Sequence, residues 1–117
     1  MTALLTKDII ENIVSDLATA IPDTFGDRAV RAYLFGSCAR GDFKQDSDID
    51  IAVLFDCERA EAQKYISDAA RLSTDIAMKT MQVVNFVCLP IEEFEDKKTW
   101  YPFYANIADD GRVIYER

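Results

Sequence analysis

The sequence predicts an α+β fold in which a small mixed sheet of about three or four strands packs against helices. Segments with hydrophobic residues at every third or fourth position, typical of helices, alternate with short segments rich in β-branched residues, typical of strands. The chain has 117 residues, 50% of them hydrophobic, and no repeat or flexible linker divides it. We therefore expect a single domain over residues 1–117.

The first predicted helix begins after Thr6, a residue suited to cap a helix N-terminus. Hydrophobic residues then recur at helical spacing up to Ile21, and Pro22 follows. Because proline disrupts the interior of a helix, we expect the helix to end there. Its hydrophobic face consists of Ile9, Ile10, Ile13, Val14, Leu17, Ala18 and Ile21.

Two strands are predicted next, at residues 28–35 and 48–55. The first stops at Gly36 and Ser37, after which residues 38–40 form a short helical turn and a polar loop leads to the second strand. Hydrophobic residues alternate along the second strand, which predicts that they share one buried face. They are Ile49, Ile51, Val53 and Phe55.

A second long helix is predicted over residues 59–79, where hydrophobic residues again keep the helical period. The run 83–89 is short and rich in β-branched residues, and Pro90 follows it. These features favour a buried strand over another helix.

The remainder of the chain is predicted to form short helices and a terminal extended segment. The helices are expected at 91–94 and, around Pro102, at 100–108. Gly111 would end the second of them, and residues 112–115 would be extended. This region carries an aromatic cluster that either packs in the core or forms a partner-binding surface. Its members are Trp100, Tyr101, Phe103 and Tyr104.

The charge of the chain limits its classes of ligand. There are 21 acidic and 13 basic residues and no histidine, which gives a net charge of −8. Such a surface repels a phosphate backbone, so we expect no direct nucleic-acid binding. It suits a basic protein partner or a divalent-cation site, and it is equally typical of an acidic soluble protein without either.

Cysteine usage and the N-terminus favour a cytoplasmic location. Cys38, Cys57 and Cys88 are widely spaced, which argues against a zinc site or a disulfide framework. Residues 1–5 lack the basic segment of a secretory leader. No apolar stretch reaches the ~18 residues of a membrane span, so we expect no membrane insertion.

Gly36 and Ser37 stand where the first strand stops, and this pair is suited to hold phosphate. A glycine has no Cβ, so a ligand can approach the backbone closely there. A short helix that follows would direct free N–H groups at phosphate oxygens, and the Ser37 hydroxyl adds a donor. The pair is therefore a candidate site for a triphosphate.

Asp48 and Asp50 are separated by a single residue at the start of the second strand, so their side chains should leave the same face. Two adjacent carboxylates repel each other unless a cation lies between them, and Mg²⁺ prefers carboxylate and phosphate oxygens. Such an ion would neutralise charge and position the groups for in-line attack on the α-phosphate of a nucleotide. We therefore expect a joint metal and nucleotide site.

The spacing of these residues resembles that of the minimal nucleotidyltransferases of the DNA polymerase β-like superfamily. The pattern of that family is Gly-Ser, ten residues, then Asp-x-Asp, and Gly36-Ser37 and Asp48-Ile49-Asp50 match it without a gap. The resemblance implies a nucleotidyltransferase fold, ATP as substrate and Mg²⁺ as cofactor. It also implies that Asp48 and Asp50 are the catalytic residues and the metal ligands.

The same resemblance implies roles for the loop between the two motifs. Gly36, Ser37, Arg40 and Ser47 would bind the nucleotide, and Arg40 or Asp42 would help to shape the loop. By its residue type alone, Arg40 is equally suited to a surface ion pair.

The family also has a third carboxylate on a later strand, which completes the metal site and can act as a base. In this sequence the polar residue of the corresponding strand is Asn85, and an amide is a far weaker base. The nearest upstream acid, Asp75, falls on a predicted helix. Three explanations remain open for the amide at this position: the true alignment differs, the activity is reduced, or the domain binds nucleotide and partner with little turnover. By itself, Asn85 is also typical of a buried side chain satisfied by the backbone.

The resemblance implies an enzyme that transfers AMP from ATP to a hydroxyl of a protein partner. Small domains of this family commonly act as antitoxins of a helical HEPN-type toxin, whose RNase activity they block by binding or by adenylylating a tyrosine. A second hypothesis is a catalytically weak or inactive nucleotide-binding module that neutralises or regulates its partner by occlusion. A small-molecule nucleotidyltransferase is a weaker third hypothesis, because such enzymes carry an additional substrate-holding domain.

Overall fold

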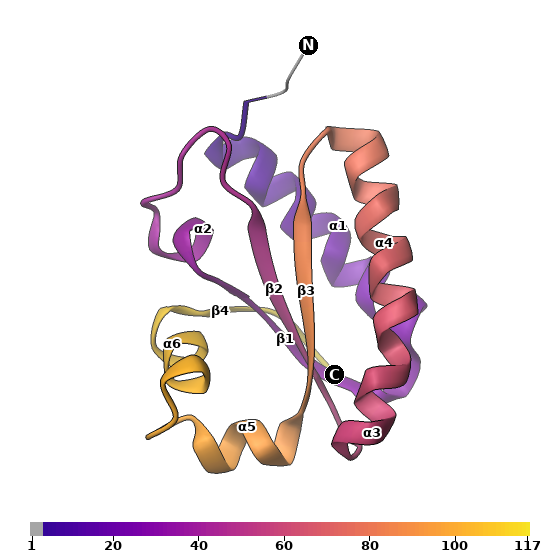
Figure 1. The fold of residues 1–117 in the computed structure, drawn as a ribbon. Helices are drawn as coiled ribbons and strands as arrows, with labels where there is room; N and C mark the ends of the chain where they lie inside the picture. Colours follow the sequence, from indigo (N-terminus) through magenta and orange to yellow (C-terminus); the bar gives the residue numbers. More distant parts are fainter. Residues whose placement is uncertain (1–3) are drawn as a thin grey trace.

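The structure, a computed structural model, describes residues 4–117 and contains a four-stranded mixed sheet with helices on both faces (Figure 1). The strand order is β3-β2-β1-β4, in which β1 is antiparallel to β2 and β4, and β2 is parallel to β3. The bounds are β1 (Ala29–Phe35), β2 (Ile49–Phe55), β3 (Val84–Pro90) and β4 (Arg112–Glu116), with a 3-10 turn η1 (Gly26–Arg28) before β1. The predicted α+β class is confirmed.

One face of the sheet is covered by two long helices, α1 (Lys7–Phe25) and α4 (Ile66–Thr80) (Figure 1). The hydrophobic residues that alternate along β2 point toward these helices and are fully buried, as predicted. Fully burying an aliphatic or aromatic side chain contributes about 1.5–3 kcal/mol. Since this layer contains most of the buried hydrophobic residues, it supplies most of the hydrophobic stabilisation.

The opposite face of the sheet is covered at one end only. There α5 (Ile91–Lys97) packs on β2 and β3, α6 (Pro102–Asp110) packs on β1, and the two helices enclose a smaller core (Figure 1). Its buried members are Ala52, Leu54, Leu89, Phe94, Tyr104 and Ile107. At the other end of this face lies the single-turn helix α2 (Ser37–Arg40), and the polar side chains of Asp48 and Asn85 are exposed. The fold therefore leaves an open end beside the connection from β1 to α2.

Helix α1 continues through Pro22, so the expected end at this residue is wrong. Thr6 caps the helix as predicted, because its Oγ1 accepts a first-turn N–H at 3.2 Å. Pro22 lacks the N–H that would bond one turn back. The last turn nevertheless persists because Ile21 and Phe25 are buried, and the N–H of Gly26 donates to the Pro22 carbonyl. Burial in the core outweighs the local cost of the proline.

The second predicted helix, residues 59–79, is interrupted. It consists of α3 (Arg59–Ala62), a 3-10 turn η2 (Gln63–Tyr65) and then α4. The tighter turn contains Tyr65, whose ring stacks on Phe55 of β2 with 4.3 Å between centroids. Helical periodicity alone does not specify such a contact.

Other boundaries differ slightly from the predictions. Strand β2 begins at Ile49, so Asp48 immediately precedes it. Helix α6 begins at Pro102 and not at Trp100, because the fixed φ and missing N–H of proline suit the first position of a helix. Gly111 ends α6 as predicted, and the extended segment after it is the edge strand β4.

The aromatic cluster is divided between the two roles considered for it. Tyr104 is buried in the smaller core, with 4% of its surface exposed. Trp100, Tyr101 and Phe103 are instead exposed. Core packing is therefore the correct interpretation for one member only.

None of the helices within residues 4–117 is long and apolar enough to cross a bilayer. The prediction about a leader falls partly on residues 1–3, which lie outside the described residues. The three cysteines are free thiols, and Cys57 is less buried than Cys38 and Cys88. Burial raises the pKa of Cys88 to about 11, so this residue acts as a small hydrophobic side chain.

Candidate active site

The connection from β1 to α2 brings the backbone of Gly36 against the side chain of Asp50. Gly36 has φ 74° and ψ −156°, a conformation that residues with a Cβ rarely adopt. A Cβ added at Gly36 would lie 2.6 Å from Asp50 Oδ2, which is closer than atoms can pack. Glycine is thus required both for the backbone conformation and for the space that the carboxylate occupies.

Ser37 is the first residue of α2. The carbonyl of Gly36 accepts the N–H groups of Ala39 and Arg40, both at 3.1 Å, so a helical turn starts here as the sequence predicts. At such a start the earlier N–H groups, those of Ser37 and Cys38, have no acceptor within the helix. N–H groups of this kind can donate to phosphate oxygens.

Asp48 and Asp50 lie together on the open end of the sheet. Asp50 is half-buried and pairs across the sheet with Phe35 on β1 and Asn85 on β3, whereas Asp48 is exposed. Asn85 Nδ2 donates to Asp48 Oδ2 at 3.1 Å, and hydrogen bonding by the same amide lowers the pKa of Asp50. Asn85 is therefore not a buried side chain satisfied by the backbone, because it is exposed and acts on both carboxylates.

The two carboxylates make this end of the sheet electrostatically negative. Burial raises the pKa of the Asp50 carboxyl and the charge of Asp48 raises it further, while Asn85 and Arg40 act in the opposite direction. Burial also raises the pKa of the Cys38 thiol, and the same two aspartates add to this rise. A bound cation would relieve the repulsion.

The side chains present fit a Mg²⁺ ion shared with a nucleotide. Within residues 4–117, no three His, Cys, Asp or Glu side chains gather to hold a metal. Asp48 and Asp50 could therefore supply only part of an octahedral shell, and phosphate oxygens and water would supply the rest, as is usual for Mg²⁺. An ion held in this way neutralises charge at the phosphate that reacts.

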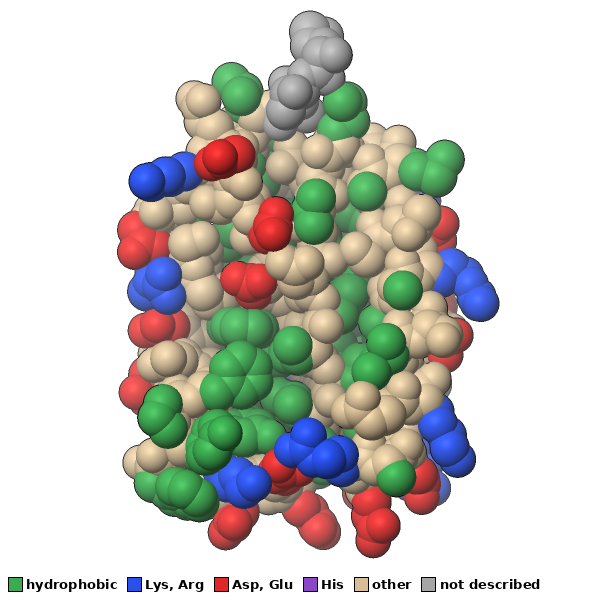
Figure 2. Space-filling view, in the orientation of Figure 1, with side chains coloured by type: hydrophobic (Ala, Val, Ile, Leu, Met, Phe, Trp, Pro, Cys, Tyr) green, Lys and Arg blue, Asp and Glu red, His purple; other side chains and the backbone are tan. Residues whose placement is uncertain are grey.

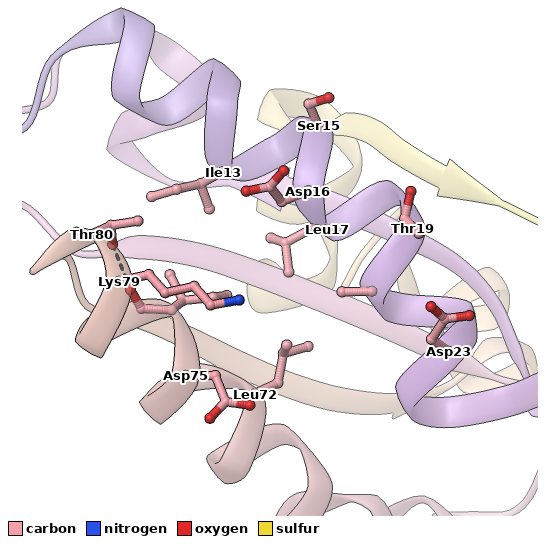
Figure 3. Close-up of a pocket in the computed structure, with 12 residues that line it drawn as sticks. Ile13, Ser15, Asp16, Leu17, Thr19, Asp23, Leu72, Asp75, Lys79 and Thr80 are labelled. Atoms are coloured by element: carbon pink, nitrogen blue, oxygen red, sulfur yellow. Dashed lines mark hydrogen bonds between the residues drawn. The ribbon is translucent and has the colours of Figure 1, made fainter.

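Asp75, the other acid considered as a third carboxylate, belongs to a different region. It lines a groove of about 560 Å³ between α1 and α4, together with Asp16, Asp23 and Lys79 (Figure 3). The two helices cover the face of the sheet opposite to that of Asp50. Asp75 therefore cannot complete the aspartate pair.

Arg40 and Ser47 both make contacts that hold the loop between α2 and β2. Arg40 Nε donates to Asp42 Oδ2 at 3.3 Å, and its Nη1 donates to Asp110 Oδ2 at 3.4 Å, which connects α2 to the end of α6. Ser47 Oγ accepts the N–H of Lys44 at 2.8 Å. Both residues thus shape the loop, and their contact with a nucleotide stays a prediction.

Two neighbours of the aspartates could not be predicted from the sequence. Cys38 Sγ donates to the Asp48 carbonyl at 3.5 Å, and Phe35 lies beside Asp50 across the β1–β2 pair. The position of Phe35 follows from strand register, which alternation of residue types does not provide. Cys38 resembles any small hydrophobic residue, and no pattern in the sequence points to it.

The fold and the arrangement of this site define a nucleotidyltransferase. Residues 25–117 match the family described as Polymerase beta, Nucleotidyltransferase, and the chain belongs to this family. The match contains the glycine-serine turn, both aspartates and the four strands. The family inferred from the spacing of the two motifs is therefore confirmed.

The chain is similar to named protein adenylyltransferases of archaea. It is 32% identical over 105 residues to a candidate protein adenylyltransferase of Methanocaldococcus jannaschii, and the aligned residues cover 90% of this chain and 97% of the relative. It is 34% identical over 83 residues to the protein adenylyltransferase MntA of Thermococcus cleftensis, and the aligned residues cover 67% of this chain and 82% of that protein.

Solved structures share the fold at lower sequence identity. A candidate nucleotidyltransferase from Sulfolobus solfataricus has a TM-score of 0.54 and 22% identity, covering 95% of this chain and 80% of that one. A toxin-antitoxin structure with AMP-PNP has a TM-score of 0.54 and 20% identity, covering 97% of this chain and 75% of that one. These likenesses confirm the nucleotidyltransferase fold.

Proposed function

We propose that this protein transfers AMP from ATP to a hydroxyl of a protein partner, as the antitoxin of a helical HEPN-type toxin. The observation that carries the proposal is the contact between Gly36 and Asp50, which joins a phosphate-binding type of turn to a pair of metal-binding carboxylates. The names of the archaeal relatives support transfer of an adenylyl group to a protein.

Each residue of the site has a proposed role. Asp48 and Asp50 hold Mg²⁺, which neutralises charge on the triphosphate. The backbone at Gly36 and the Ser37 hydroxyl bind phosphate oxygens, and Arg40 contributes positive charge beside them. The acceptor oxygen bonds to the α-phosphorus, the bond from that phosphorus to the bridging oxygen breaks, pyrophosphate leaves, and the hydroxyl proton passes to solvent.

A toxin as the acceptor is supported by the structural likeness and by charge. One neighbour in fold is a toxin-antitoxin structure with AMP-PNP. The net charge of −8 favours association with a basic protein surface. Such a pair would act in the cytoplasm, where three free thiols are stable.

The proposal is tested with radiolabelled ATP and a purified HEPN-type toxin. We expect label to appear on the toxin with the wild-type protein and to disappear with Asp48→Ala/Asp50→Ala. The matched control is Asp16→Ala/Asp23→Ala, which also removes two acids but on α1, beside the groove of the other face, and should transfer normally. Persistent labelling by the Asp48/Asp50 variant would overturn the site assignment.

A second candidate function, neutralisation by binding alone, is favoured by Asn85. Its amide donates to Asp48 from the strand where the family has a third carboxylate, and it cannot serve as an efficient base. In that case Asp48→Ala/Asp50→Ala would still neutralise the toxin. Loss of neutralisation, with the complex still formed, would reject this alternative.

A further inference from the structure

Three aromatic side chains are exposed where α5 connects to α6 and at the start of α6. Trp100, Tyr101 and Phe103 are 63%, 43% and 40% exposed, and we name these three residues the aromatic surface. Large apolar side chains that are exposed together mark an interaction site more often than single ones do. Aromatic residues are also enriched at the centres of protein interfaces.

The aromatic surface is held in place by contacts beneath it. The Phe103 ring lies 5.7 Å from that of the buried Tyr104, whose hydroxyl donates to Glu93 at 3.0 Å. Trp100 Nε1 donates to the carbonyl of Asp96 at 3.1 Å. Side chains that are already ordered lose little conformational freedom when a partner binds, which favours affinity.

This surface adjoins the aspartate pair. The Phe103 ring meets Phe35 edge on, at 6.2 Å between centroids, and Phe35 pairs with Asp50 across β1 and β2. Figure 2 shows hydrophobic side chains gathered over α5 and α6, directly beside acidic side chains near the start of β2. A molecule resting on the aromatic surface would therefore extend toward Asp50.

The extent of the surface favours a polypeptide over a nucleotide base. A base stacks on the face of one aromatic ring, whereas three exposed rings spread over the α5–α6 connection and the first turn of α6. The aspartate side adds charge complementarity, since Asp48 is exposed next to Asp50, and the nearby Arg40 is already shared between Asp42 and Asp110. An acceptor with basic residues on that side would be attracted to it.

Resting on the proposed transfer to a protein, we propose that the aromatic surface is where the protein acceptor docks. An apolar side chain of the acceptor packs on Trp100 and Phe103, and basic residues of the same segment face Asp48 and Asp110. This placement brings the receiving hydroxyl to the nucleotide held at Asp50. The surface thereby determines which protein receives AMP.

The test measures steady-state AMP transfer to a purified HEPN-type toxin by Trp100→Ala and Phe103→Ala. The KM for the toxin should rise about 10-fold or more, as expected for anchors at an interface centre. The KM for ATP and kcat at saturating toxin should not change, because the proposed phosphate contacts come from Gly36 and Ser37 and not from these two rings. Met78→Ala is the matched control, since Met78 is 81% exposed on α4 and should leave both KM values unchanged.

Each outcome decides between the proposals. If the wild-type protein labels the toxin but both surface variants keep its KM, the docking site is overturned and the proposed function stands. If only the KM for ATP rises, the rings hold the nucleotide base, and the docking site is likewise overturned. If the wild-type protein labels no toxin, the proposed function fails and the docking site fails with it.

A crosslinking measurement does not depend on the stability of the alanine variants. A photoreactive benzoylphenylalanine in place of Tyr101 should crosslink the toxin on irradiation, and the same group in place of Met78 should not. Crosslinking from position 78 alone would overturn the proposal.

Discussion

Replacing Gly36 by alanine separates the two reasons for glycine at this position. The conformation of Gly36, φ 74° and ψ −156°, is nearly restricted to glycine, and another residue there costs about 1–3 kcal/mol. The added Cβ would also lie 2.6 Å from Asp50 Oδ2. Because this oxygen is at the end of a side chain, the carboxylate can rotate away at small further cost. We therefore expect Gly36→Ala to lose metal binding more than stability.

Gly26 provides the matched control for this substitution. Its φ of 73° and ψ of −161° are almost the same, but a Cβ added at Gly26 meets no atom within 4 Å. Both variants should therefore lose about 1–3 kcal/mol of unfolding free energy, a fall in Tm of about 4 °C for each kcal/mol. Displacement of Asp50, the proposed metal ligand, should reduce affinity for Mg²⁺ and nucleotide by about 10-fold or more, and only in Gly36→Ala.

The measurements are thermal unfolding and calorimetric titration with Mg²⁺ and a non-hydrolysable ATP analogue. A double-mutant cycle of Gly36→Ala with Asp50→Ala adds a direct test, since truncating Asp50 removes the oxygen that the new Cβ meets. If Gly36→Ala binds Mg²⁺ and the analogue as tightly as the wild-type protein does, while its stability falls as that of Gly26→Ala does, then the new Cβ does not displace Asp50, contrary to the prediction.

Three further predictions concern single side chains. Because the pKa of Asp50 is raised in the fold, ionisation of this carboxyl lowers the stability of the metal-free protein as the pH rises above the ordinary pKa of an aspartate. Asp50→Asn should therefore raise the Tm of the metal-free protein at pH 7 and remove metal binding, and an unchanged Tm would contradict this. Asn85→Asp should tighten Mn²⁺ binding and lower the stability of the metal-free protein, because it adds a third carboxylate beside Asp48. Weaker Mn²⁺ binding would contradict this and show that the amide itself is needed for metal binding. Iodoacetamide at pH 8 should label Cys57 before Cys88, because burial raises the pKa of Cys88 to about 11. If mass spectrometry shows the reverse order, Cys88 is not the more buried of the two thiols.

The main features of the site could be predicted because they depend on local sequence. The alternation along β2 places Ile49 and Ile51 in the core, and this fixes the opposite direction for Asp50. A glycine at the end of a strand indicates a special backbone conformation, which Gly36 indeed has.

The features that could not be predicted depend on residues distant in the sequence. Helix α1 continues beyond Pro22 because Phe25 is buried in the core. Arg40 forms an ion pair with Asp110, 70 residues later in the sequence. Tyr104 and Phe103 are adjacent and similar in type, yet one is buried and the other exposed. In each case, tertiary packing decides between alternatives that local patterns leave equal.

The proposed activity requires Asp48 and Asp50 to share a cation with a nucleotide. Electron paramagnetic resonance of Mn²⁺, titrated with a non-hydrolysable ATP analogue, measures this without any acceptor protein. We expect nucleotide-dependent Mn²⁺ binding by the wild-type protein and by Asp75→Asn, and none by Asp48→Asn/Asp50→Asn. Equal Mn²⁺ and nucleotide binding by that double variant would contradict the account.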